Sequence, residues 1–181
     1  MKLTEITNRS RSFCTFLNEN NLTDLGVEVG VREAKNANRL LTYWQGQKLF
    51  LIDTWRKPET KKAAIQNIKH HIPRYTLIHN TSLRAVTEFK DNTLDFCHID
   101  AGHTYKDVLQ DMYAWYPKIK PGGVLCGHDY SIDKEQERLR KKPWPHIGVQ
   151  KAVDEFVKEK KLFLHTDQWE KNGPNCWYIT K

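Results

Sequence analysis

Long apolar runs are missing from this chain of 181 residues, and its first residues, MKLTEITNRSRSF, contain no hydrophobic stretch. A membrane-spanning helix needs about 20 mostly apolar residues, and a secretory signal needs an apolar segment of about 7–15 residues. The sequence therefore predicts neither a membrane span nor a secretory signal. We expect an intracellular, cytoplasmic protein.

Cysteine is scarce, and the four cysteines are scattered: Cys14, Cys97, Cys126 and Cys176. Structural zinc sites and redox motifs use closely spaced CxxC pairs, and this chain has none. Cys97 and Cys126 lie inside apolar segments that are predicted to be buried strands. We expect all four to be reduced thiols.

The dinucleotide-binding pattern GxGxxG is also absent. Gly26 and Gly30 are too far apart for it, and Arg32 and Ala34 stand where a pyrophosphate needs open backbone. A nicotinamide or flavin cofactor is therefore disfavoured.

Positive charge is in excess, with a formal net charge of +7 and a sequence pI near 9.2. Such a balance favours contact with an anionic partner, whether a nucleic acid, a membrane surface or a small acidic substrate. A solvated, lysine-rich face is the common alternative.

Apolar, β-rich segments alternate with segments of helical period along the chain. The predicted strands are residues 25–29, 49–52, 75–78, 94–99 and 124–126, and amphipathic helices are predicted around residues 105–116 and 149–157. This alternation predicts an α/β fold with a Rossmann-like, doubly wound and mostly parallel sheet. Residues 162–165 and 176–180 have no helix between them and predict an antiparallel C-terminal hairpin. We expect one domain over residues 1–181, with a charged, proline-punctuated lid or insertion at 131–146.

Polar side chains gather where the first three predicted strands end, which is where open α/β sheets bind ligands. Glu28 precedes Gly30, and its carboxylate could accept hydrogen bonds from a bound ammonium or merely cap the next helix. Asp53 follows Gly30 by about 20 residues, the spacing at which an acid binds ribose hydroxyls. Trp55 could lie against an adenine or simply pack. His79, Asn80, Thr81 and Ser82 offer small polar groups after the third strand, or an ordinary helix N-cap.

The segment from Leu94 to Tyr130 has the same form: strand, polar loop, helix, Pro-Gly-Gly turn and strand. Its two strands end at Asp100 and at His128 and Asp129. With the preceding strand ends, this pattern resembles the class I S-adenosylmethionine-dependent methyltransferases over nearly the whole chain. It is closest to the small-molecule, macrocin O-methyltransferase-like group, whose motifs IDxxHxY and PGGxxxxHDY are matched at Ile99, Asp100, His103, Tyr105, Pro121, Gly122, Gly123, His128, Asp129 and Tyr130.

The resemblance implies a binding site for S-adenosyl-L-methionine and an antiparallel last strand inserted between two parallel ones. The implied cofactor-binding residues are Glu28, Gly30, Asp53, Thr81, Ser82 and Asp100. Many relatives carry a further glycine where this chain has Ala34.

The resemblance also implies catalytic residues, His103 as general base with Asp100, and a divalent cation such as Mg²⁺ held by Asp100, His128 and Asp129. A base or a Lewis-acidic ion is useful because a sugar hydroxyl is a poor nucleophile until its proton is drawn off. At His128 the metal-dependent relatives tend to carry a carboxylate. The alternative is that Asp100 contacts the cofactor, His103 caps the following helix, and no metal binds.

The expected function is methyl transfer to a hydroxyl of a small molecule, a sugar or sugar-bearing metabolite, and the expected partner is that hydroxylated acceptor. A nucleic-acid methyltransferase is an alternative, although the chain has DAGH where base-amine methyltransferases resemble one another in [DN]PP[YF]. An RNA ribose acceptor stays open. A third alternative is a catalytically silent, Rossmann-like binding module. The sequence is compatible with a homo-oligomer and does not define the oligomeric state.

Overall fold

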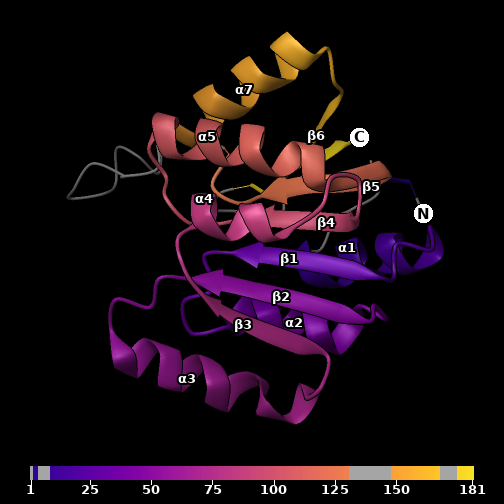
Figure 1. Cartoon of the computed structure of the whole chain (residues 1–181). Coiled ribbons are helices and arrows are strands. Elements are labelled where there is room, and N and C mark those ends of the chain that lie inside the picture. Colours follow the sequence, from indigo (N-terminus) through magenta and orange to yellow (C-terminus); the bar gives the residue numbers. More distant parts are fainter. Residues whose placement is uncertain (1, 4–8, 131–147, 168–174) are drawn as a thin grey trace, which may run out of the picture.

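The computed structural model describes residues 2–3, 9–130, 148–167 and 175–181. Its centre is a seven-stranded sheet in the order β3-β2-β1-β4-β5-β7-β6 (Figure 1). The strands are β1 (Leu25–Val29), β2 (Lys48–Asp53), β3 (Tyr75–His79), β4 (Leu94–Ile99), β5 (Ile119–Gly127), β6 (Leu164–Thr166) and β7 (Trp177–Thr180). The first five strands are parallel, which confirms the predicted doubly wound α/β fold. The expected lid at 131–146 lies outside the described residues.

Helices cover both faces of the sheet, and each face has its own apolar core. Residues of α1 (Arg9–Glu19), α2 (Lys35–Tyr43) and α3 (Pro58–Ile68) pack into one core. Residues of α4 (Ser82–Ala85), α5 (Tyr105–Trp115) and α7 (Gly148–Lys160) pack into the other, and α5 lies beside α7 (Figure 1). Short 3₁₀ turns follow α3, α4 and α5 at Lys69–His71, Val86–Glu88 and Tyr116–Lys118. None of the helices in these described segments is both long and apolar enough to cross a membrane.

The C-terminal hairpin adds strands β7 and β6 to the sheet beside β5. Strand β7 runs antiparallel between β5 and β6, as the family resemblance implied. Its residues Trp177, Tyr178 and Ile179 are all buried, so β7 is a central strand rather than an edge.

Strand β5 is longer than the predicted 124–126 because it begins before the Pro-Gly-Gly sequence. Gly122 has a φ of 79°, a backbone conformation that glycine adopts without steric cost. The pairing register with β4 shifts between Leu94 and Phe96, so the turn predicted at Gly122 is an irregularity within the strand.

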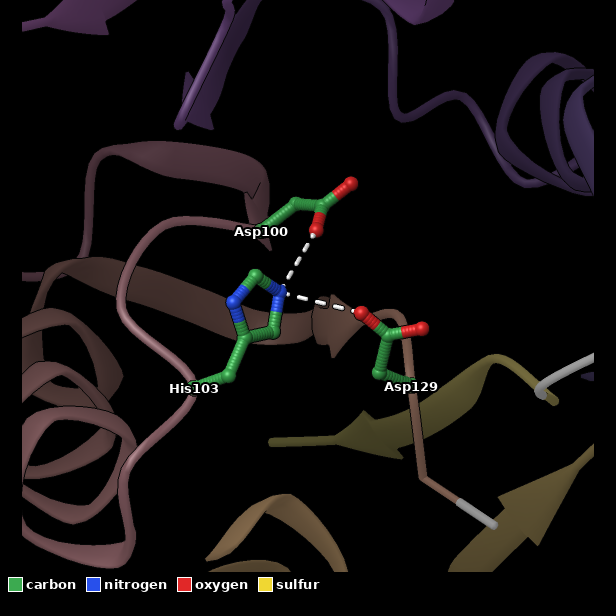
Figure 2. Close-up of side chains that lie close together, drawn as sticks. All are labelled: Asp100, His103 and Asp129. Carbon is green, nitrogen blue, oxygen red and sulfur yellow. Dashed lines mark hydrogen bonds and ion pairs between the residues drawn. The ribbon is translucent and has the colours of Figure 1, made fainter. Parts of the chain in front are cut away.

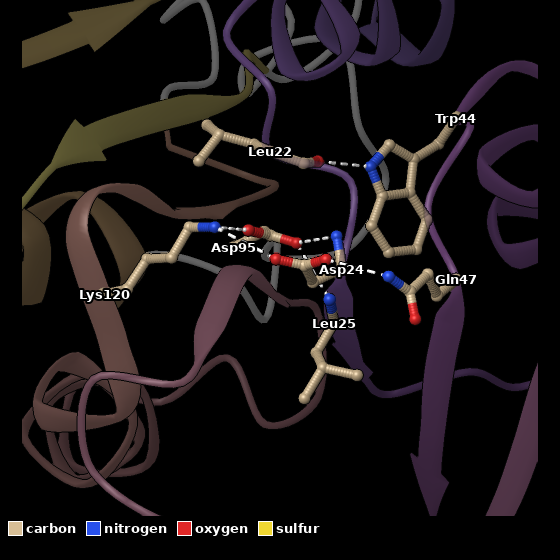
Figure 3. A network of polar contacts seen from close by, with 7 residues as sticks. All are labelled: Leu22, Asp24, Leu25, Trp44, Gln47, Asp95 and Lys120. Atoms are coloured by element: carbon tan, nitrogen blue, oxygen red, sulfur yellow. Dashed lines mark hydrogen bonds and ion pairs between the residues drawn. The ribbon is translucent and has the colours of Figure 1, made fainter.

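A buried carboxylate joins the amino ends of three strands (Figure 3). Asp95, which is fully buried, accepts hydrogen bonds from the backbone N–H groups of Asp24 and Leu25 and forms an ion pair with Lys120. Burial alone would lower the pKa of Lys120, but the charges and hydrogen bonds of Asp95 and Asp24 raise it. The network therefore fixes how β1, β4 and β5 start, at the sheet edge opposite the polar strand ends.

Candidate functional site

A cleft of about 970 Å³ opens at the carboxyl ends of the parallel strands. It is lined by the segments that follow β1, β2, β4 and β5 and by the start of α4. Eight of the nine predicted site residues line it: Glu28, Gly30, Asp53, Ser82, Asp100, His103, His128 and Asp129. Thr81, the ninth, is not part of its wall.

Gly30 lets two strand ends come close together at the floor of the cleft. Its φ is 92°, and a Cβ atom built on it would lie 2.0 Å from the carbonyl oxygen of Asp100. The Gly30 N–H donates to the carbonyl of Ile52, and the Asp100 N–H donates to that of Val29. The β1 loop is thereby held against both neighbouring strand ends, and any side chain at position 30 would separate them.

Glu28 is 1% exposed, and its Oε1 accepts a hydrogen bond of 3.0 Å from the side-chain amide of Asn36. The N-cap position of α2 is Ala34, which has no side-chain capping bond. Glu28 thus binds a side chain of the first turn of α2. Its carboxylate lies in the wall of the cleft.

Asp53 joins the loops that follow β1 and β2. Its Oδ2 accepts from the Arg32 N–H and its Oδ1 from the Trp55 N–H, both at 2.7 Å. The Trp55 indole donates in turn to the Arg32 carbonyl at 3.0 Å, and this side chain is only 4% exposed. Trp55 therefore packs between the loops, whereas Asp53 keeps lone pairs for further donors in the cleft.

Thr81 and Ser82 play structural parts at the start of α4. Thr81 is the N-cap residue, although it makes no side-chain capping bond. The Ser82 hydroxyl donates to Asp111 at 2.6 Å and accepts from the Trp115 indole at 2.9 Å, which ties α4 to α5. Burial raises the pKa of Asp111 to about 6, despite the hydrogen bond from Ser82, which acts to lower it.

A histidine lies between two carboxylates in the wall formed by the β4 and β5 ends (Figure 2). The Nε2 atom of His103 is 3.0 Å from Asp129 Oδ2 and 3.3 Å from Asp100 Oδ1. The other ring nitrogen points away from both acids (Figure 2). Since two acceptors face Nε2, this nitrogen carries the proton of the neutral ring, and Nδ1 is left as the basic position.

The two carboxylates change the acidity of His103. Burial by itself would lower the pKa of His103, but the hydrogen bonds and charges of Asp100 and Asp129 outweigh it and raise the pKa to about 9. The side chain is 23% exposed, so the ring can still reach a ligand. The two carboxylates therefore favour the protonated form of the His103 ring.

The cap of α5 shows which of the two roles considered for His103, general base or helix cap, is compatible with the structure. Thr104, not His103, caps α5, because its side chain accepts the backbone N–H of Asp107. His103 is therefore available to the cluster.

His128 is not part of the group of side chains whose donor atoms lie closest together. Potential ligand atoms of Asp100, His103 and Asp129 all lie within 4.8 Å of one another. The Nδ1 atom of His128 is 3.0 Å from the other oxygen of Asp129. Within the described segments, the histidine grouped with both acids is thus His103, rather than the predicted His128.

Sequence reasoning missed a set of cations in the same wall. The cleft is also lined by Arg32, Lys35, Arg39 and Arg56. Lys35 and Arg39 are one turn apart on α2, a spacing that is visible in the sequence, whereas Arg32 lies in the loop before the helix.

Comparison with known protein families gives a match over residues 25–130, which is more than half of the chain, and the family is described as a methyltransferase domain. The matched range begins at β1 and ends just after β5, so it includes every predicted site residue. A curated relative, the uncharacterised protein y4gI of Sinorhizobium fredii, is 29% identical over 91 residues. That alignment covers 46% of this chain but only 10% of the relative, so the match spans about a tenth of that protein's length.

Solved structures share the fold at low sequence identity. An O-methyltransferase from Bacillus cereus in complex with SAH (S-adenosylhomocysteine) has a TM-score of 0.69 and 14% identity, and the match covers 99% of this chain and 84% of that one. The O-methyltransferase TomG from Streptomyces achromogenes, in complex with SAM, has a TM-score of 0.68 and 13% identity, with 93% and 77% covered. An rRNA methylase from Streptococcus thermophilus has a TM-score of 0.68 and 14% identity, with 97% and 98% covered.

Proposed function

This chain belongs to the methyltransferase domain family, and on that premise we propose that it transfers the methyl group of S-adenosylmethionine to a hydroxyl oxygen of a small molecule. The observation that carries the proposal is the cleft at the carboxyl strand ends, in which Asp100, His103 and Asp129 form one cluster. O-methyltransferases with this fold have been solved with SAM or SAH bound, which supports the choice of cofactor and acceptor atom.

The charges of the cleft suit a cationic cofactor. S-adenosylmethionine carries a sulfonium and an ammonium, and Glu28, Asp100 and Asp129 supply three carboxylates in the wall. In this proposal Glu28 and the Gly30 loop hold the methionine part, and Asp53 accepts the ribose hydroxyls. Ser82, and Thr81 just outside the wall, lie on the side of the adenine.

Methyl transfer needs alignment of the acceptor and a destination for one proton. In this proposal the acceptor oxygen would attack the methyl carbon as the carbon–sulfur bond breaks to release S-adenosylhomocysteine, and the hydroxyl proton would pass to Nδ1 of His103 in its neutral form. Asp100 and Asp129 hold the Nε2 proton and stabilise the imidazolium that forms, as a carboxylate does for a catalytic histidine. Because the sulfonium already activates the methyl group, positioning supplies most of the rest.

A divalent cation is an alternative way to neutralise the two acids. Asp100, His103 and Asp129 offer two carboxylates and an imidazole, a donor set that fits a divalent ion. Such an ion would act as a Lewis acid on the acceptor oxygen. Binding requires that His103 lose its proton, so metal affinity should rise steeply with pH.

The acceptor class is a sugar or a sugar-bearing metabolite in this proposal. An RNA acceptor is the second candidate, favoured by the net charge of +7 and by the likeness to an rRNA methylase. Salt separates the two, since the affinity for an oligonucleotide falls steeply with salt concentration and that for a neutral sugar does not.

Calorimetric titration of S-adenosylmethionine and S-adenosylhomocysteine, with Mg²⁺, Mn²⁺ or a chelator, tests the proposal directly. Micromolar binding is expected.

Asp53→Ala should weaken cofactor binding at least tenfold, because the ribose hydroxyls lose a charged acceptor. His103→Ala should leave the affinity nearly unchanged and lower turnover by about 10²–10⁴, as expected for loss of a general base. Turnover is followed as release of S-adenosylhomocysteine with a panel of sugars and glycosylated compounds.

Absence of cofactor binding would overturn the proposal. Tight binding without turnover on any hydroxyl acceptor would instead support a silent binding module.

A further inference from the structure

Cations from the segments that follow β1 and β2 also line the cleft. Arg32 and Arg39 lie along α2 and the turn before it, and Arg56 follows β2. All three side chains are exposed, whereas Glu28 and Asp129 on the inner wall are buried. The cleft therefore has an acidic interior and a basic rim.

Within the described part of the chain, none of the three guanidinium groups is held in an ion pair with an acid of the cleft, although the charge of Arg32 contributes, after Lys35, to the lowered pKa of Glu33. The neighbouring cation Lys35 forms an ion pair of 2.9 Å with Glu33. Among the residues whose positions are described, no carboxylate forms an ion pair with the side chain of Arg32, Arg39 or Arg56. Their charge is available to a ligand.

The backbone that carries two of these arginines is held in place. Asp53 accepts the N–H groups of Arg32 and Trp55, and the Trp55 indole returns a hydrogen bond to the Arg32 carbonyl. Arg32 and Trp55 have φ angles of 51° and 33°, which are unusual for residues with a side chain. Such backbone persists only where its surroundings determine it, and it fixes where the side chains of Arg32 and Arg56 start.

We propose that Arg32, Arg39 and Arg56 form an anion-binding subsite for a phosphate or carboxylate group of the methyl acceptor. The inference rests on the proposed function and narrows its substrate to an anionic hydroxyl compound. A guanidinium binds such groups through two parallel hydrogen bonds, so one carboxylate or phosphate oxygen pair occupies one arginine. The cofactor has a single carboxylate. Even if one arginine binds it, two are left for a second anion.

Calorimetric titration of pyrophosphate and inorganic phosphate tests the subsite, first with the protein alone and then with the protein saturated with S-adenosylhomocysteine. Pyrophosphate should bind in both states, because the cofactor carboxylate does not fill the subsite. The double variant Arg39→Gln, Arg56→Gln should raise the dissociation constant of pyrophosphate at least tenfold. The matched control Arg84→Gln, Lys62→Gln removes the same charge from exposed positions outside the cleft and should leave it unchanged.

Two results would overturn the subsite or its assignment. Equal weakening in the control pair would show a general charge effect rather than a site. Loss of pyrophosphate binding when S-adenosylhomocysteine is present would assign the arginines to the cofactor carboxylate. In that case the double variant would lose affinity for S-adenosylhomocysteine but not for 5′-methylthioadenosine, which lacks the carboxylate.

Failure of the proposed function can be distinguished from failure of the anion subsite. It appears as absence of S-adenosylhomocysteine binding to the unmodified protein, whereas the titration of pyrophosphate into the protein alone still reports on the arginines.

Discussion

One nitrogen of His103 contacts two carboxylate oxygens, and this local arrangement changes the acidity of the ring. In the unfolded chain the imidazole has an ordinary pKa near 6.5, and in the folded protein the pKa is about 9. The folded state therefore binds this proton more tightly. The stability that it contributes is complete below pH 6.5 and is lost as the pH rises towards 9.

Raising the pH from 6.5 to 8.5 should lower the free energy of unfolding by about 1 kcal/mol through His103, once the full linkage value is reduced for solvent screening. Urea unfolding at a series of pH values measures this slope. His103→Gln should remove most of it, and His70→Gln, at an exposed position on the turn after α3, should keep it. A His103→Gln variant with the slope of the unmodified protein would contradict the role assigned to Asp100 and Asp129.

The sequence was a sufficient guide to residues that end strands. Glu28, Asp53, Asp100 and Asp129 could be placed because parallel strands bring their carboxyl ends to one edge. His103 was expected beside Asp100 from the family resemblance, whereas the position of His128, which contacts Asp129 alone of the two acids, is defined only by the fold. The three arginines were missed because exposed basic residues are usually solvated.

The strands depend on an anchor at their other ends. Asp95 joins β4 to β1, 70 residues earlier in the sequence, through the backbone of Asp24 and Leu25, and joins β4 to β5 through Lys120 (Figure 3). A charge this deeply buried is tolerated only with its partners, because an unpaired buried carboxylate loses its hydration without compensation. A local sequence pattern does not predict this network, since its members come from three separate segments of the chain.

Lys120→Met should destabilise the protein by about 2–4 kcal/mol in urea unfolding at pH 7, because the buried carboxylate of Asp95 loses its cation while Lys120 is partly exposed to solvent. The double variant Asp95→Asn, Lys120→Met should be less destabilised than the sum of the two single variants. Additive effects would mean that Asp95 and Lys120 are not coupled.

At the level of elements, prediction succeeded where the pattern is local and long. The five parallel strands and helices α5 and α7 follow from apolar periodicity. Strand β5 begins earlier than predicted because Pro121 and the two glycines fit a strand with a shifted register. The Pro-Gly-Gly sequence around Gly122 predicts a turn that ends a strand, and the pairing with β4 shows that the strand continues through it.

The whole molecule unites distant segments around one cleft. Its walls come from residues 28 to 129, and the ligand is expected to contact the ends of β1, β2, β4 and β5 together. Binding to this assembly should stabilise the entire fold, because the unfolded chain holds none of these groups in place.

Saturation with S-adenosylhomocysteine at 100 times its dissociation constant should add about 2.7 kcal/mol to the free energy of unfolding. For a chain of this size, that corresponds to a rise in melting temperature of about 5–10 °C, measurable by calorimetry or fluorescence. Asp53→Ala at the same ligand concentration should show a clearly smaller rise. No rise in the unmodified protein would contradict binding at the strand ends.

The central place of β7 has a consequence for protein synthesis. Strand β5 ends at Gly127 but pairs with Trp177 to Thr180, about 50 residues later. At a translation rate of about 5–20 residues per second, the β5 edge waits roughly 3–10 s for its partner. During that time the nascent chain presents an apolar strand with unsatisfied backbone groups, which is a template for aggregation. Ribosome-bound chains that end before residue 177 should therefore be the form of this protein that most needs a chaperone.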